Sequence, residues 1–221
     1  MISIITPTVR PDGLSIVKKA LDRQTFRDFE WIVQSPTRPL PKGNVWQLNY
    51  DYNRAIEKAK GSLIISWQDY TYANPDALAK FWFHFQNEPR TLVTAVGNKY
   101  TDDTWTVMTW KDPRERTDEG TYYPCYFNDV EFNLCSILKE ALYEIGGFDE
   151  SLDTYYGMDG YSVVDRINLL GGYDFKIDQT IKSYSLEHSR PKDWDEKNAL
   201  PIYNEKIHPR YLENRSLGYL K

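Results

Sequence analysis

Polar side chains follow three short hydrophobic runs near the start of the chain, and they are the first candidates for chemistry. The runs end at Thr6, Val33 and Trp67. If the runs are strands of one parallel sheet, their carboxyl ends meet at the edge where such sheets bind ligands. The polar residues there offer hydroxyl, guanidinium, amide and carboxylate groups: Thr8, Arg10, Gln34, Ser35, Gln68, Asp69 and Tyr70. This edge is where we expect a binding site.

Strands and helices alternate over the first half of the chain. Each hydrophobic run is followed by apolar residues at helical spacing, which predicts three strand-helix units. The expected strands cover 2–6, 29–33 and 62–67, and the expected helices cover 14–21, 52–59 and the residues after an Asn74 N-cap. Three such units in succession predict a parallel sheet with right-handed crossovers.

The second half has a different pattern. Residues 92–96 and 104–110 alternate like antiparallel strands, and 111–120 is charged and typical of a mobile loop. Further along we expect a helix capped by Ser136, a helix over 160–170, a strand over 177–183 and a polar surface tail beyond 188.

The composition excludes several classes of protein. The 221 residues contain 27 basic and 32 acidic side chains, so the net charge of −5 gives no general attraction for nucleic acid. No stretch resembles a membrane span, and two cysteines without a signal peptide predict reduced thiols and a cytoplasmic location. Aromatic residues make up 15% of the chain. They either line a site for sugars or bases, or fill the core.

Several segments together resemble the family-2-like glycosyltransferases of the GT-A fold. They are Ile2 to Thr8, Gln24-Thr25-Phe26, Phe29 to Val33, Asn53 before Ala59-Lys60-Gly61, Asp69 after a buried strand, and Gly146-Gly147-Phe148-Asp149-Glu150. The resemblance implies a Rossmann-like α/β fold, in which helices flank a mixed, mainly parallel sheet beside a smaller antiparallel portion. It divides the chain into a nucleotide-binding half (1–90), an acceptor half (91–190) and a C-terminal surface tail (191–221).

The resemblance also implies a reaction: transfer of a sugar, with inversion, from a nucleotide-sugar donor to an acceptor hydroxyl. A UDP-sugar is the expected donor, and Mn or Mg is expected to bridge its diphosphate. The family's Asp-x-Asp motif corresponds here to Gln68-Asp69-Tyr70, which has a single carboxylate. The alternatives for the metal are therefore weaker binding, a shifted geometry or no metal at all. Asp69 and His188 are the expected metal ligands, although Asp69 as a turn residue and His188 as a structural histidine remain alternatives.

Around the nucleotide, the resemblance implies Thr8, Arg10, Ser35, Asn53 and Gln68 together with Asp69. Arg10 suits a diphosphate, because its guanidinium can donate two parallel hydrogen bonds, but a solvated loop arginine is an alternative. The Gln34-Ser35 pair stands where the family commonly has aspartates that bind the base and ribose. The identity of the nucleotide therefore cannot be carried over from the family.

Asp159 is the only carboxylate in the segment that matches the family's catalytic acidic motif, so it is the expected general base. The alternatives are that Asp159 only caps the following helix, or that Asp149 or Asp165 is the base. Trp67, Tyr70, Asp149 and Tyr156 are expected on the acceptor side. The sequence does not identify the acceptor: a glycan is one candidate, and a hydroxylated base, as in phage DNA modification, is a second that the acidic charge argues against. The alternative function is a catalytically degenerate protein that binds nucleotide or glycan.

Overall fold

The computed structural model describes residues 1–36, 47–116, 120–154, 158–187 and 196–218. The strands are β1 (Ile2–Pro7), β2 (Phe29–Gln34), β3 (Leu63–Trp67), β4 (Thr71–Ala73), β5 (Thr91–Tyr100), β6 (Met108–Trp110), β7 (Tyr122–Pro124), β8 (Leu134–Leu138) and β9 (Asp174–Leu186). The helices are α1 (Leu14–Asp22), α2 (Leu48–Lys58), α3 (Ala77–Asn87), α4 (Lys139–Glu144), α5 (Asp159–Leu170), α6 (Glu196–Ile202) and α7 (His208–Ser216).

All the described strands join one mixed sheet in the order β2-β1-β3-β8-β5-β9-β4. β1 is parallel to β2 and β3, β8 is antiparallel to β3 and β5, and β9 is parallel to β5. Five of the seven strands on this path therefore point the same way, and only β8 and β4 are reversed. β6 pairs antiparallel with β5, as the sequence predicted. The α/β fold class with a mainly parallel sheet is confirmed.

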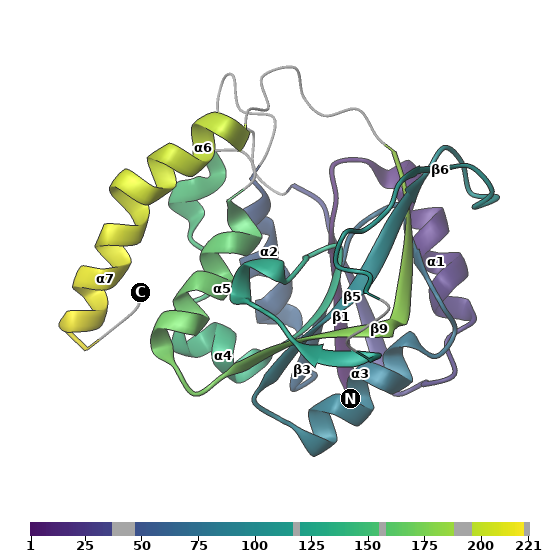
Figure 1. Cartoon of the computed structure of the whole chain (residues 1–221), viewed down its shortest axis with the longest axis horizontal. Coiled ribbons are helices and arrows are strands. Elements are labelled where there is room, and N and C mark those ends of the chain that lie inside the picture. The colour runs from purple at the N-terminus through teal and green to yellow at the C-terminus, as the bar shows by residue number, and fades with distance from the viewer. Residues whose placement is uncertain (37–46, 117–119, 155–157, 188–195, 219–221) are drawn as a thin grey trace.

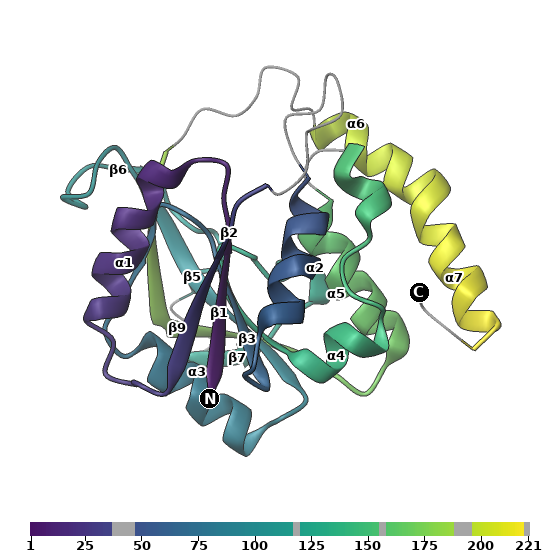
Figure 2. The ribbon, with the colours of Figure 1, turned by 180° about the vertical axis from the view of Figure 1, so that it is seen from behind.

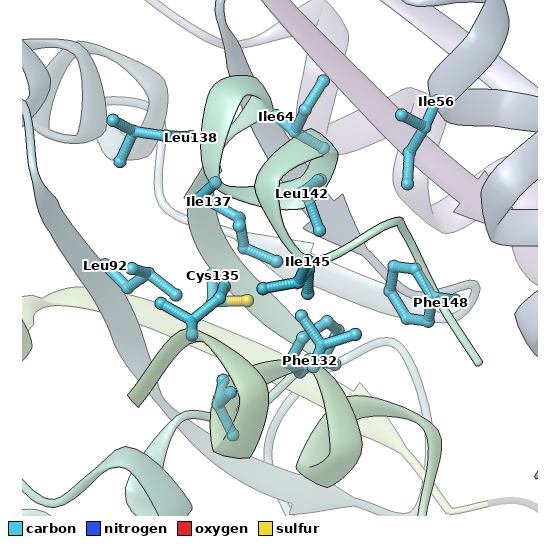
Figure 3. Close-up of a cluster of buried hydrophobic side chains, with 14 of the residues drawn as sticks. Ile56, Ile64, Leu92, Phe132, Cys135, Ile137, Leu138, Leu142, Ile145 and Phe148 are labelled. Atoms are coloured by element: carbon cyan, nitrogen blue, oxygen red, sulfur yellow. The ribbon is translucent and has the colours of Figure 1, made fainter. Parts of the chain in front are cut away.

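Helices cover both faces of this sheet. α1 and α3 lie on one face, and α2, α4 and α5 lie on the other (Figures 1 and 2). Side chains alternate along the buried strands, so that Ile65 of β3 packs in the cluster with α1 and α3 while its neighbour Ile64 packs with α2 and α4. Figure 3 shows this second cluster, which includes Leu92, Ile137 and Leu142. The central strands are therefore buried on both faces of the sheet.

The prediction that a helix begins at Ser136 is wrong. Residues Leu134–Leu138 form β8, a fully buried strand, and α4 begins only at Lys139. A short apolar run fits a central strand as well as a helix, so its period did not decide between them. Ser136 bonds across the sheet instead, accepting the Val93 backbone N–H at 3.2 Å.

Asn74 is not a helix cap either. α3 begins at Ala77 and Asp76 occupies the N-cap position. The Asn74 side chain accepts the Lys182 backbone N–H at 2.9 Å, which ties the turn before α3 to β9.

The described part of the expected C-terminal tail is helical. α6 and α7 run along the outer side of α5, drawn in yellow in Figure 1. Tyr203 and Tyr211 are buried there in a cluster with Met158 and Leu169. These helices therefore pack against the element that begins with Asp159. The division of the chain at residue 190 stays a prediction.

Part of the expected mobile loop is anchored. The Asp112 side chain is fully buried and pairs with Arg114 at 2.5 Å. It also accepts the Gly97 backbone N–H at 2.9 Å. Residues 117–119 of the same loop lie outside the described residues. None of the described helices has both the length and the hydrophobicity of a membrane-crossing segment.

Candidate active site

A cavity of about 620 Å³ opens at the carboxyl ends of β1 and β3, the edge that the sequence indicated. Its walls come from both halves of the chain. The loops after β1 and β3 contribute Thr8, Arg10 and Asp69, and the start of α5 contributes Asp159. The start of α2, strands β5 and β6, the segment before β8 and the end of β9 contribute further residues. Cavities of this size are typical of small-molecule and cofactor sites.

Thr8 and Asp69 are joined directly across the two loops. The Thr8 hydroxyl donates to Asp69 Oδ2 at 2.5 Å, and both side chains are buried. The Arg10 guanidinium lies 3.7 Å from Asp69 Oδ1. The Arg10 backbone N–H donates to Thr8 Oγ1 at 2.9 Å, which fixes the start of the loop. Asp69 is therefore already bonded within the protein.

Burial dominates the charge state of Asp69. Desolvation raises the pKa of the Asp69 carboxyl, and the hydroxyl of Thr8 and the charge of Arg10 lower it only in part. The net pKa lies above the ordinary value for an aspartate, since a buried carboxylate loses more hydration than these partners return.

Tyr70 packs its ring under the Arg10 guanidinium, at 4.6 Å from the ring centroid. The backbone of Tyr70 has a φ of 49°, which is uncommon for a residue other than glycine. A Cβ on Gly13 would lie 2.7 Å from the Tyr70 backbone nitrogen and 2.5 Å from its ring. The sequence therefore needs glycine at position 13 so that Tyr70 can approach the first loop and support Arg10.

Asp153 fixes the wall that α2 provides. Its carboxylate accepts the backbone N–H groups of Asn49 at 2.8 Å and Tyr50 at 3.2 Å, in the first turn of the helix. A helix N-terminus attracts a carboxylate through its free N–H groups and its dipole. Sequence reasoning missed this cap because 104 residues separate Asn49 from Asp153.

Arg114 is a second arginine of the cavity, and it is fully engaged. Besides Asp112, it donates to the backbone carbonyls of Asp129 at 2.6 Å and Ala95 at 3.2 Å. Burial alone would raise the pKa of Asp112, but the hydrogen bonds and charge of Arg114 outweigh it and the pKa falls. The Asp-Pro-Arg sequence at 112–114 could have indicated an ordered turn in the cavity wall. The many charges of this loop predicted a mobile segment instead.

Asp159 is the first residue of α5, is partly buried and lines the cavity. Met158 occupies the N-cap position, so the interpretation of Asp159 as the cap is wrong. A Cβ on Gly160 would meet the Phe132 ring at 2.5 Å, which explains why glycine follows Asp159. Burial raises the pKa of the nearby Tyr52 phenol, and the negative charges of Asp159 and Asp69 raise it further. Tyr52 is therefore a neutral neighbour of both carboxylates.

The two alternative bases are bonded elsewhere. Asp165 accepts the Tyr203 hydroxyl at 2.5 Å and contacts His208 Nδ1 at 2.7 Å. Asp149 pairs with Arg210 and accepts the Tyr211 hydroxyl at 2.6 Å. Neither carboxylate lines the cavity. Both tie α5 and the turn before it to the C-terminal helices, and the placement of Asp149 on the acceptor side stays a prediction.

Three other predicted residues lie away from the cavity. Trp67 is fully buried in the core, where its indole N–H donates to the Thr71 carbonyl at 2.7 Å. Ser35 is exposed and does not line the cavity. Asn53 donates to the Phe148 carbonyl at 3.0 Å and accepts the Phe148 N–H at 2.8 Å. Its amide holds the Gly-Gly-Phe turn against α2, a role that helical spacing does not reveal.

Gln68 and Tyr70 do line the cavity, Tyr70 beside Arg10. His188 and Tyr156 lie outside the described residues. Lys99 and Trp110 are cavity residues that the sequence did not single out. They are paired across β5 and β6, with the Lys99 ammonium 5.2 Å from the Trp110 ring centroid.

The described residues do not fit a divalent cation. No three His, Cys, Asp or Glu side chains converge in the part of the chain that the structure covers. Hard cations need several oxygen ligands, and Asp69 already accepts Thr8 and faces Arg10. No chemical step is therefore assigned to a metal here.

Among known proteins, only solved structures match this chain, and at such low sequence identity they show the fold alone. No protein-family model and no curated protein matches the sequence. Among solved structures, GalNAc-T7 with UDP, GalNAc and Mn²⁺ has a TM-score of 0.65 at 13% identity, over 97% of this chain and 50% of that chain. S. aureus TarS in complex with UDP has a TM-score of 0.61 at 12% identity, over 84% of this chain and 60% of that one. The fold is the GT-A glycosyltransferase fold. The chain spans between half and three fifths of the length of these two chains. The cavity lies at the carboxyl edge of the sheet, where the sequence predicted a binding site.

Proposed function

We propose that the protein is an inverting glycosyltransferase that moves a sugar from a nucleotide-sugar donor to an acceptor hydroxyl. The observation that carries the proposal is the cavity at the carboxyl edge of a GT-A sheet, with a guanidinium on one wall and a partly buried carboxylate on another. UDP-sugars are the preferred donors to test, since both neighbours named above contain UDP.

The donor lies against the loops after β1 and β3. The Arg10 guanidinium donates to the diphosphate and stabilises the negative charge that grows on it as the sugar leaves. Thr8 and Gln68 line the same wall and offer hydrogen bonds to the nucleotide. Asp69 holds Thr8 and Arg10 in place from behind.

Asp159 takes the proton from the acceptor hydroxyl. The acceptor oxygen then forms a bond to the anomeric carbon while the bond from that carbon to the diphosphate oxygen breaks. The proton ends on Asp159, and the nucleoside diphosphate leaves. Inversion follows because attack and departure occur on opposite faces of the sugar.

Asp159 is preferred among the cavity carboxylates because it stands in the segment that matches the family's acidic motif and begins α5 at the cavity. Three of the others hold the walls together. Asp112 pairs with Arg114, Asp153 caps α2 and Asp69 accepts Thr8. Glu131 also lines the cavity and is exposed, which makes it the matched control for Asp159.

The proposed acceptor is a glycan. Trp110 is 41% exposed on the lining of the cavity, and an indole face stacks well on a sugar ring. Weak binding of oligosaccharides together with tight binding of DNA that carries hydroxymethylated bases would favour the nucleic-acid acceptor instead. The cytoplasmic location stays a prediction, and Cys125 and Cys135 are free thiols, as reduced surroundings require.

A catalytically degenerate binding protein is the second candidate. The observation that favours it is the single carboxylate at each acidic motif, Asp69 beside Gln68 and Asp159 beside Gly160. Both candidates bind a donor, but only the enzyme turns it over.

Thermal unfolding with a panel of nucleotide-sugars separates the two. A donor at about 100 times its Kd stabilises a protein by about 2.7 kcal/mol. Stabilisation by one donor, with slow release of its nucleoside diphosphate, supports the enzyme. Stabilisation without release supports the binding protein, and no response to any donor contradicts both.

A further inference from the structure

Both Asp69 oxygens face groups of the protein's own, and this shapes the wall where the donor diphosphate is proposed to bind. Oδ2 accepts the Thr8 hydroxyl at 2.5 Å, and Oδ1 faces the Arg10 guanidinium at 3.7 Å. The Asp69 side chain is only 6% exposed. A divalent cation on this carboxylate would lie beside a guanidinium that is also positively charged, and their repulsion costs free energy at such short range.

The residues around Asp69 offer a cation little else. Gln68 and Tyr70 replace the second carboxylate that the family motif carries. Within the described ranges, no group of three potential metal ligands forms. In GalNAc-T7, by contrast, the structure with UDP also holds Mn²⁺.

Arg10 is placed to supply the positive charge itself. Asp69 attracts its guanidinium from one side and the Tyr70 ring supports it at 4.6 Å. The backbone N–H of Arg10 is fixed on Thr8. The side chain is 29% exposed and lines the cavity, so the guanidinium borders the space in which a ligand would lie. A planar guanidinium matches two phosphate oxygens at once.

We infer that Arg10, held by Asp69 and Tyr70, takes the place of the divalent cation, so that the protein binds the diphosphate of its donor without metal. This inference rests on the proposed function, because it concerns how the same cavity holds the nucleotide.

Calorimetry on the full chain tests it, with UDP, GDP, CDP, dTDP and ADP as probes. Each is titrated once in EDTA and once in millimolar Mn²⁺. The expected result is that the best diphosphate binds with Kd values within about threefold of each other in the two buffers. Binding that needs Mn²⁺ overturns the inference and leaves the proposed function standing. No binding of any diphosphate in either buffer overturns both.

Variants of Arg10 sharpen the test. In EDTA, Arg10→Ala should weaken diphosphate binding about 10-fold to 100-fold, the usual value of a charge-assisted contact. The diphosphate affinity of Arg10→Lys should lie between those of wild type and Arg10→Ala, because lysine keeps the positive charge but lacks the planar guanidinium. Binding of the matching nucleoside, which lacks phosphates, should not change, and this also checks that the variants fold. Arg23→Ala, at the exposed end of α1, is the matched control. If Arg10→Ala lost nucleoside binding and diphosphate binding equally, Arg10 would not act on the diphosphate, and the inference would be contradicted.

Discussion

The two walls of the cavity are built in different ways. On the donor wall, Thr8, Arg10, Asp69 and Tyr70 contact one another, and local loops hold the whole arrangement. On the opposite wall, Asp159 begins a helix whose position depends on distant parts of the chain. The donor wall is organised before a ligand arrives, because Asp69 already accepts the Thr8 hydroxyl and faces Arg10.

Remote contacts place the helix of the Asp159 wall. Ser162 of α5 contacts the Tyr211 hydroxyl at 2.9 Å, and the buried Arg166 donates to the Ile145 carbonyl at 2.9 Å. The C-terminal helix α7 therefore supports the helix that Asp159 begins, and Leu200 of α6 lines the cavity itself. Changes to the Asp159 wall should affect turnover, and changes to the donor wall should affect donor binding and stability. Changes to the C-terminal helices should affect stability most.

The largest effect is expected for Asp159→Asn. Turnover should fall about 100-fold or more, because the amide cannot accept the proton. The melting temperature and donor affinity should stay near wild type, since asparagine has the same shape. Glu131→Gln, on the same cavity, should keep most of the turnover. A Glu131→Gln variant that loses as much as Asp159→Asn would move the role of the base to Glu131.

Thr8→Val should destabilise the donor wall. It removes the hydroxyl that donates to the buried Asp69 carboxylate and leaves that oxygen without this bond. We expect a loss of about 2 kcal/mol in the free energy of unfolding, measured in urea. Ser35→Ala, at an exposed site outside the cavity, should change it by less than about 0.5 kcal/mol. A neutral Thr8→Val would mean that the donor wall is not held by this bond.

Tyr211→Phe tests the support of α5. Tyr211 lies in α7, and its hydroxyl contacts Ser162 of α5 and donates to Asp149 in the turn before α5. Its loss should cost about 1 kcal/mol of stability. Donor affinity should be unchanged, and turnover should change less than in Asp159→Asn. A selective loss of donor affinity would contradict the separation of the two walls.

The smallest effect is a pH dependence. Burial alone would raise the pKa of Asp149, but Ser151, Tyr211 and Arg210 lower it below the ordinary 3.8. The unfolded chain then binds this proton more readily, so stability rises with pH and is lost as the pH falls below about 4. Stability measured from pH 6 to pH 3 should decline less steeply in Asp149→Asn than in wild type. Parallel curves would contradict the lowered pKa.

The sequence predicted the fold better than it predicted the site. Apolar runs and turn residues revealed the first three strand-helix units, since their patterns are local. Ser136 misled because a short apolar run fits both a strand and a helix. Thr8, Arg10 and Asp69 were found from strand ends, but Asn53 and Asp149 proved to be structural partners of distant segments. Asp153 capping α2 depends on contacts across 104 residues, which no local pattern contains.

A crystal structure with a bound nucleoside diphosphate would show where the donor binds and which residues hold its phosphates. The diphosphate to use is the one that stabilises the protein most. We expect its phosphates to lie within hydrogen-bond distance of the Arg10 guanidinium, with the terminal phosphate facing the side of the cavity where Asp159 begins α5. A nucleotide bound outside this cavity, or with its phosphates away from Arg10, would contradict this expectation.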